Sequence, residues 1–184
     1  MAKAALQKEW YDIVAPDLFG NDTVAETPAG EEEEVDGRRV KVDLQDLMPS
    51  SDKYYMDVFL KVDDVEGDRA KTRIDGHTVS KEYVSKMVSR RSNRIDAVTD
   101  AETSDGSTVR VKMVGVTIKK TSSSKVNAAR KRLKEAVEEE AGKAGLDDFM
   151  ESIFSGGLQK RLEDAAQKIY PLREVEVRKT EVRP

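Results

Sequence analysis

The stretch TVRVKMVGVTI, residues Thr108–Ile118, decides the fold class of this chain. Apolar side chains at Val109, Val111 and Met113 alternate with basic ones, and this two-residue period is typical of a half-buried β-strand. A second strand-forming run, Ile95–Thr103, comes shortly before it, with only the sequence SDGS between the two. Because an acidic-Gly pair suits a tight turn, we expect the two runs to form an antiparallel hairpin.

Toward the N-terminus, three more runs show the same alternation of apolar and polar residues. These runs are Arg38–Leu44, Tyr54–Val65 and Arg69–Ile74. The pair Asp75-Gly76 predicts a turn directly after the third run, and the single histidine, His77, follows this pair. We therefore expect three strands in this part of the chain, and an imidazole that stabilises the turn or is exposed.

Helical periodicity begins after these strands and returns in the last third of the chain. Ser80 is a suitable N-cap for a helix that runs to about Arg91. After a Ser-rich joint, glycines separate three further helical segments, and Pro171 prevents the last of them from continuing. These segments are Ser124–Ala141, Leu146–Phe154 and Leu158–Ile169. The alternation then returns, so we expect a closing strand over Leu172–Thr180.

This order of elements predicts an α+β fold with an antiparallel, β-barrel-like core and an inserted helix. Residues 1–37 are expected to form an irregular arm with an acidic loop at Glu31–Glu34, and residues 38–120 the barrel-like core. Residues 121–184 are expected to add the helical segment and the closing strand, packed on that core. At 184 residues the chain is long enough for one good core, so we expect a single globular unit.

The composition argues against an enzyme and against a membrane protein. The chain has no cysteine and one histidine, which excludes disulfides, thiolate metal sites and a His-rich relay. It has no glycine-rich phosphate-binding motif and no apolar run of the roughly 18 residues that span a bilayer. We therefore expect no catalytic residue, no metal, no cofactor, no small-molecule substrate and no membrane contact, in a protein of the cytoplasm.

Positive charge is concentrated in the middle of a chain whose formal net charge is −4. Residues 81–134 carry fourteen Lys and Arg against five Asp and Glu. Local cations neutralise backbone phosphates, so this block predicts polyanion binding. Aromatic residues are sparse there, which favours recognition of the backbone and shape of folded RNA over base stacking. The expected contacts in this block are Lys81, Lys86, Arg90, Arg91, Arg94, Lys112, Lys119, Lys120, Lys125, Arg130, Lys131 and Lys134.

Several alternatives stay open from these residues alone. Any of the cations could instead form an internal ion pair, such as Arg130 or Lys134 with Glu138. The protein could be a free-standing RNA chaperone or regulator, and the least favoured alternative is a metal-dependent hydrolase. That hydrolase would use carboxylates among Asp63, Asp64 and Asp75.

A set of short segments in a fixed order over nearly the whole chain resembles the S3Ae (S1e) family of small-subunit ribosomal proteins, in its archaeal type. The most specific segments are the opening KEWYDIVAP (Lys8–Pro16) and the closing YPLR (Tyr170–Arg173) with VEVRK (Val175–Lys179). The other segments are Phe19-Gly20, Gly37-Arg38, Val42–Leu44, Asp46-Leu47, Gly76-His77, Tyr83, Val88–Arg91, Arg94–Asp96 and Thr103–Gly106.

The resemblance implies a β-barrel core with packed helices, located on the platform of the small ribosomal subunit near the messenger exit. It also implies contacts with 16S-type ribosomal RNA and with neighbouring ribosomal proteins, a role in subunit assembly and translation, and no catalytic activity. Within the closing segment we add Arg173, Arg178 and Lys179 to the expected RNA contacts. The acidic run Glu31–Glu34 should then face solvent or a basic neighbour.

Overall fold

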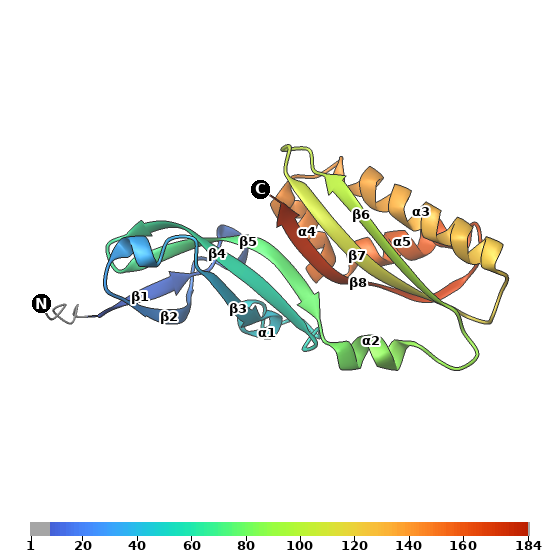
Figure 1. Ribbon diagram of the computed structural model, residues 1–184, viewed down its shortest axis with the longest axis horizontal. Coiled ribbons are helices and arrows are strands. Elements are labelled where there is room, and N and C mark those ends of the chain that lie inside the picture. The colour runs from blue at the N-terminus through green and yellow to red at the C-terminus, as the bar shows by residue number, and fades with distance from the viewer. Residues whose placement is uncertain (1–7, 184) are drawn as a thin grey trace, which may run out of the picture.

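Strand β5 (Arg69–Val79) runs through the middle of the molecule and joins two lobes (Figure 1). The computed structural model describes residues 8–183, so the first seven residues of the expected arm lie outside it. Within this range the chain forms eight strands and five α-helices. The first half of β5 pairs with strands of the N-terminal lobe, and its last residues also pair with a strand of the C-terminal lobe.

The N-terminal lobe is built from strands that surround the first half of β5. Strand β1 pairs antiparallel with β2 and parallel with β5, while β4 lies between β3 and β5 and is antiparallel to both. A short helix and two 3-10 turns, Asp17–Phe19 and Glu32–Glu34, complete the lobe. Its elements are β1 (Glu9–Val14), β2 (Thr23–Ala29), β3 (Arg39–Asp43), α1 (Leu44–Leu47) and β4 (Met56–Glu66).

The C-terminal lobe is a three-stranded antiparallel sheet whose one face is covered by three helices (Figure 1). Its strands are β6 (Arg94–Glu102), β7 (Thr108–Thr117) and β8 (Leu172–Arg183). Its helices are α3 (Ser123–Ala141), α4 (Leu146–Phe154) and α5 (Gly157–Gln167). Helix α2 (Lys81–Met87) connects the two lobes.

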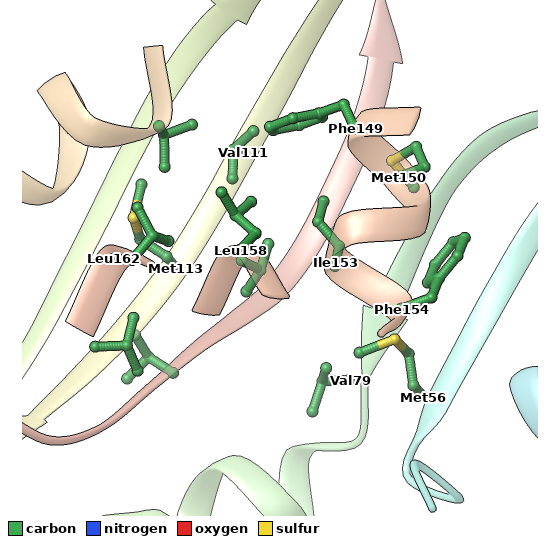
Figure 2. Packing of buried hydrophobic residues seen from close by; sticks show 14 of the residues in the cluster. Met56, Val79, Val111, Met113, Phe149, Met150, Ile153, Phe154, Leu158 and Leu162 are labelled. Carbon is green, nitrogen blue, oxygen red and sulfur yellow. The ribbon is translucent and has the colours of Figure 1, made fainter. Parts of the chain in front are cut away.

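Alternating apolar residues of the sheet and one face of each helix form the core. Figure 2 shows Leu158 and Leu162 of α5 against Val111 and Met113 of β7. Helix α4 adds Phe149, Met150, Ile153 and Phe154, which are all buried; in Figure 2 Phe149 lies toward Val111, whereas Phe154 lies toward Met56 and Val79 of the N-terminal lobe. One apolar cluster therefore extends from the C-terminal lobe across the junction.

The junction itself depends on Gly76 and His77. A Cβ atom at Gly76 would overlap the main-chain carbonyl of Thr180, so only glycine allows β8 to approach β5 this closely. His77 is fully buried, and its Nε2–H donates to the carbonyl of Val177 (2.7 Å) while its Nδ1 accepts from the hydroxyl of Thr180 (2.7 Å). The predicted turn at Asp75-Gly76 and the turn-stabilising or exposed histidine are therefore wrong: the strand continues to Val79 because β4 pairs with it along its whole length, and β8 pairs with it from Gly76 to Thr78.

The hairpin β6–β7, strands β3 and β4 and helices α2 to α5 are confirmed where the periodicity predicted them. The Ser80 hydroxyl accepts from the N–H of Tyr83 (3.3 Å), as expected of an N-cap, although α2 already ends at Met87. The irregular arm is wrong for its described part, because β1 and β2 are paired strands.

A barrel is not confirmed. Over residues 8–183 the hydrogen-bonded path β2-β1-β5-β8-β7-β6, with β4 and β3 branching from β5, leaves β2, β3 and β6 as open edges. Within the same range, no helix is both long and apolar enough to cross a membrane.

Candidate nucleic-acid interface

Three loops of the C-terminal lobe meet at one end of its sheet: residues 88–93, 118–122 and 168–171 (Figure 1). The side-chain oxygen of Asn93 accepts from the main-chain N–H of Thr121 (2.7 Å) and links the first two loops. The Tyr170 hydroxyl donates to the carbonyl of Lys119 (3.4 Å) and links the third loop to the second. Loops that are far apart in the sequence therefore form one surface.

We call this surface the basic end and define it by five cations. They are Arg90, Arg91, Lys119, Lys120 and Lys125, and all five are exposed. Over residues 8–183 none of the five has a carboxylate partner within ion-pair distance. Unpaired, solvated cations that gather on one surface are available to neutralise phosphate groups.

Local structure explains why these cations lie in the loops. Strand β7 ends at Thr117 and α3 begins at Ser123, so Lys119 and Lys120 occupy the connection between them. Lys125 lies in the first turn of α3, which contains no acidic residue, and its ammonium stands over the ring of Tyr170 at 5.5 Å. A cation in the first turn opposes the helix dipole, so Lys125 adds positive potential to an end that is already positive.

Arg173 supports the loop that carries Arg90 and Arg91. Its guanidinium donates to the main-chain carbonyl of Met87 and to the hydroxyl of Ser89 (3.4 Å). Helix α2 precedes this loop and packs on the segment before β4, because the ring of Tyr83 stacks on that of Tyr55 with centroids 3.6 Å apart. Arg173 therefore positions the basic end, and its donors are already partly used.

The cations on the exposed face of β6, β7 and β8 differ, because the structure pairs them with carboxylates. Arg94 makes a two-pronged contact with Asp96 (both 2.8 Å). Arg178 lies 3.8 Å from the same carboxylate, so Asp96 serves two guanidinium groups. Arg94 and Arg178 are therefore partly neutralised by the protein itself.

Glu181 partly neutralises two further residues of this face. Its carboxylate lies 2.7 Å from the ammonium of Lys179 and 3.0 Å from that of Lys112. The hydrogen bonds from Lys179 and Lys112 lower the pKa of Glu181 to about 2, so the carboxylate stays ionised. Lys112 and Lys179 therefore share one carboxylate, which offsets one of their two positive charges within the sheet.

The remaining expected contacts lie on α2 and α3. Arg130 donates from Nε to the carbonyl of Asp96 (2.9 Å) and so covers the open edge of β6. Lys131 reaches only a long i,i+4 pair with Glu135 (3.9 Å) and is largely in water. The suggested partner of Arg130, Glu138, accepts instead from the hydroxyl of Thr99. Like Arg130, three more of these expected contacts have no carboxylate within ion-pair distance among residues 8–183: Lys81 and Lys86, which are exposed on α2, and Lys134, which is half-buried on α3.

Carboxylates that could serve a hydrolase do not gather. Asp75 pairs with Arg39 (2.6 Å), and Asp63 lies 3.5 Å from Arg73. In the part of the chain that the structure describes, no group of three or more His, Cys, Asp or Glu residues could hold a metal ion. The proposed set Asp63, Asp64 and Asp75 therefore forms no centre.

Sequence reasoning missed Asn93 and Tyr170 as residues of this surface. Asn93 is hydrogen-bonded to the residues at both ends of the loop between β7 and α3. Its side-chain oxygen accepts from the N–H of Thr121, and its main-chain N–H donates to the hydroxyl of Thr117 (2.7 Å). No periodicity marks such a residue, because its partners are more than twenty positions away. The only available signal for Tyr170 was its place in the closing YPLR segment.

Comparison with known proteins agrees with these features. Residues 3–184 match the model of the Ribosomal S3Ae family. The small ribosomal subunit protein eS1 of Methanopyrus kandleri is 38% identical over 179 residues, which cover 95% of this chain and 85% of that protein. The proteins of the same name from Saccharolobus islandicus and Saccharolobus solfataricus are 37% identical over 175 residues, which cover 95% of this chain and 84% of each. The resemblance read from the short segments is thus confirmed, and the chain belongs to the Ribosomal S3Ae family.

Proposed function

We propose that this protein is a structural constituent of the small ribosomal subunit that binds 16S-type ribosomal RNA through its basic end. In this proposal it lies on the platform of the cytoplasmic subunit, contacts neighbouring ribosomal proteins, and supports subunit assembly and translation. Membership in a family of structural ribosomal proteins makes it a non-enzymatic component. The name that its relatives share, small ribosomal subunit protein eS1, supports a place in the small subunit.

One observation carries the RNA contact: five exposed cations without carboxylate partners, over the described residues, on loops that Asn93 and Tyr170 tie together. The expected contacts on the sheet face, Lys112 among them, are already paired with carboxylates. We therefore propose that the basic end makes the main phosphate contacts. Lys81, Lys86 and Lys131 extend it, and the sheet face contributes less.

The distribution of acidic residues supports this orientation. The acidic 3-10 turn Glu32–Glu34 is exposed and lies in the N-terminal lobe, at the other end of the long axis from the basic end (Figure 1). Repulsion between these carboxylates and RNA phosphates at the basic end is screened at physiological salt, where the Debye length is about 8 Å. The basic end can therefore meet RNA although the whole chain is acidic.

Sedimentation of the small subunit through a gradient at increasing salt tests the proposal. We expect the protein to travel with the subunit and to be released as salt competes for the phosphates. Replacing Lys119 and Lys120 by Gln should shift release to lower salt. A protein found mainly in the light fractions at low salt would instead be a free-standing RNA chaperone or regulator.

A further inference from the structure

Two of the large apolar side chains that the structure exposes lie within the basic end. Ile118 is 51% exposed and Ile169 is 37% exposed. Their segments are neighbours, because the main-chain N–H of Ile118 donates to the carbonyl of Pro171 (3.4 Å). A single exposed isoleucine is ordinary, but these two lie on adjoining loops, and together they leave apolar surface exposed to water.

Cations border this apolar surface along the chain. Lys119 and Lys120 follow Ile118 directly, and Lys168, which is exposed, precedes Ile169. The Tyr170 ring, next in sequence, is already covered by the ammonium of Lys125. A partner that satisfies this surface must present a compact apolar face with negative charge immediately beside it.

We propose that the basic end holds an unpaired, unstacked nucleotide of the RNA, with its base against Ile118 and Ile169 and its flanking phosphates against Lys119 and Lys120. In a continuous A-form duplex the base faces are stacked on one another, so such a duplex would cover the cations and leave both isoleucines in water. A nucleotide that leaves the stack presents an apolar base face next to its own phosphates. Apolar side chains that contact unstacked bases are a recurring device of nucleic-acid binding.

This inference rests on the proposed function, because it specifies which feature of the RNA the same surface takes. In this inference the affinity for RNA has two contributions, one from phosphate contacts and one from base contacts. Phosphate contacts depend on salt, whereas contact between a base and an isoleucine side chain depends on buried apolar area and hardly on salt.

The experiment compares two synthetic RNA hairpins that differ by one unpaired nucleotide in the stem. Binding of the full chain is measured at several salt concentrations for the wild type and for the double variant Ile118→Ser with Ile169→Ser. Val98→Ser is the matched control, since Val98 is 41% exposed in the middle of β6 and outside the basic end. Circular dichroism and melting temperature verify that each variant folds.

We expect the wild type to bind the hairpin with the unpaired nucleotide about tenfold more tightly, as burial of an exposed isoleucine against a base would give. The double variant should lose this preference and keep the salt dependence, and Val98→Ser should change neither.

Equal wild-type affinity for both hairpins would overturn the inference while leaving phosphate binding, and with it the proposed function, intact. Tighter binding to an acidic, leucine-containing peptide than to either RNA would also overturn it and assign the surface to a protein neighbour. If the wild type binds neither RNA and is absent from the subunit fractions, the proposed function itself is contradicted, and the inference that rests on it is contradicted as well.

Discussion

The side-chain oxygen of Asn93 accepts a hydrogen bond from the main-chain N–H of Thr121 at 2.7 Å, and this contact joins two basic loops. Arg90 and Arg91 precede Asn93 on one loop, and Lys119 and Lys120 precede Thr121 on the other. The relative position of these four cations, which have no carboxylate partner over the described residues, therefore depends in part on this side-chain amide.

Replacing Asn93 by Ala should lower both stability and RNA affinity. Loss of one hydrogen bond to a half-buried main-chain donor is worth about 1 kcal/mol of unfolding free energy. RNA affinity should fall as well, because the two loops no longer present their cations in a fixed arrangement. Asn127→Ala is the control, since over residues 8–183 the Asn127 side chain has one hydrogen bond, which it accepts from Arg130 within α3. Thermal melting and RNA titration check both effects, and an unchanged affinity in Asn93→Ala would show that the link does not organise the surface.

Unpaired and paired lysines should differ in the salt dependence of RNA binding. Replacing both Lys119 and Lys120 by Gln should reduce the slope of log K against log salt by about two ions. Replacing both Lys112 and Lys179 by Gln should reduce that slope by less, because the carboxylate of Glu181 already offsets one of these two positive charges. Equal reductions in the two double variants would contradict the assignment of the main phosphate contacts to the basic end.

His77 should make the folded state sensitive to mild acid. Burial, with a smaller contribution from nearby Lys53, lowers the pKa of His77 to about 4 from its usual 6.5. As the pH falls below 6.5 the unfolded chain takes up the proton first, so stability is complete above that pH and is lost down to about pH 4. Between pH 7.5 and 5 the imidazole should account for a loss of about 2 kcal/mol of unfolding free energy.

The variant His77→Gln lacks the titrating imidazole, so the difference between its pH profile and that of the wild type gives the contribution of His77 alone. The variant should be less stable than the wild type at pH 7.5, since it loses bonds to Val177 and Thr180, and should lose less stability on going to pH 5. Glu176, whose pKa burial raises, titrates with the opposite sign but is present in both proteins. Denaturant unfolding at each pH gives the comparison, and parallel pH profiles would refute a buried neutral imidazole.

Gly76→Ala should separate the two lobes. The new methyl group would overlap the carbonyl of Thr180, so β5 and β8 could not pair, at a cost of about 3 kcal/mol or more. Gly106→Ala is matched to it, because Gly106 also has positive φ (84°) but has open space around its Cβ position. Its cost should stay near the 1–2 kcal/mol of an αL backbone. Similar melting temperatures for the two variants would argue against close approach at Gly76.

The local hydrophobic pattern was sufficient to predict the strands and helices whose own sequence shows a clear two-residue or helical period. The hairpin of Ile95–Thr103 with Thr108–Ile118 and the helix predicted over Ser124–Ala141 follow from alternation and from helical spacing, and both are present. Strand β2, Thr23–Ala29, was missed because its sequence TVAETPA has few large apolar residues; its pairing with β1 defines it. The continuation of β5 through Gly76 was missed for the same reason, since its pairing with β4 on one side and with β8 on the other defines it.

The candidate site was predictable as a charge excess but not as a surface. The sequence places many cations between residues 81 and 134, and it cannot distinguish those that find a carboxylate from those that do not. Glu181 meets Lys112 across two neighbouring strands, whereas Lys119, a few residues further on, meets no carboxylate over the described residues. Such partners are set by strand register and loop placement, which are tertiary properties.

A density map of the purified small ribosomal subunit that contains this protein tests the central claim most directly. We predict RNA phosphates in contact with Lys119, Lys120 and the loop of Arg90 and Arg91, with the acidic turn Glu32–Glu34 directed away from RNA. A map in which RNA covers the sheet face of Lys112 and Lys179 while the basic end faces solvent or another protein would contradict it.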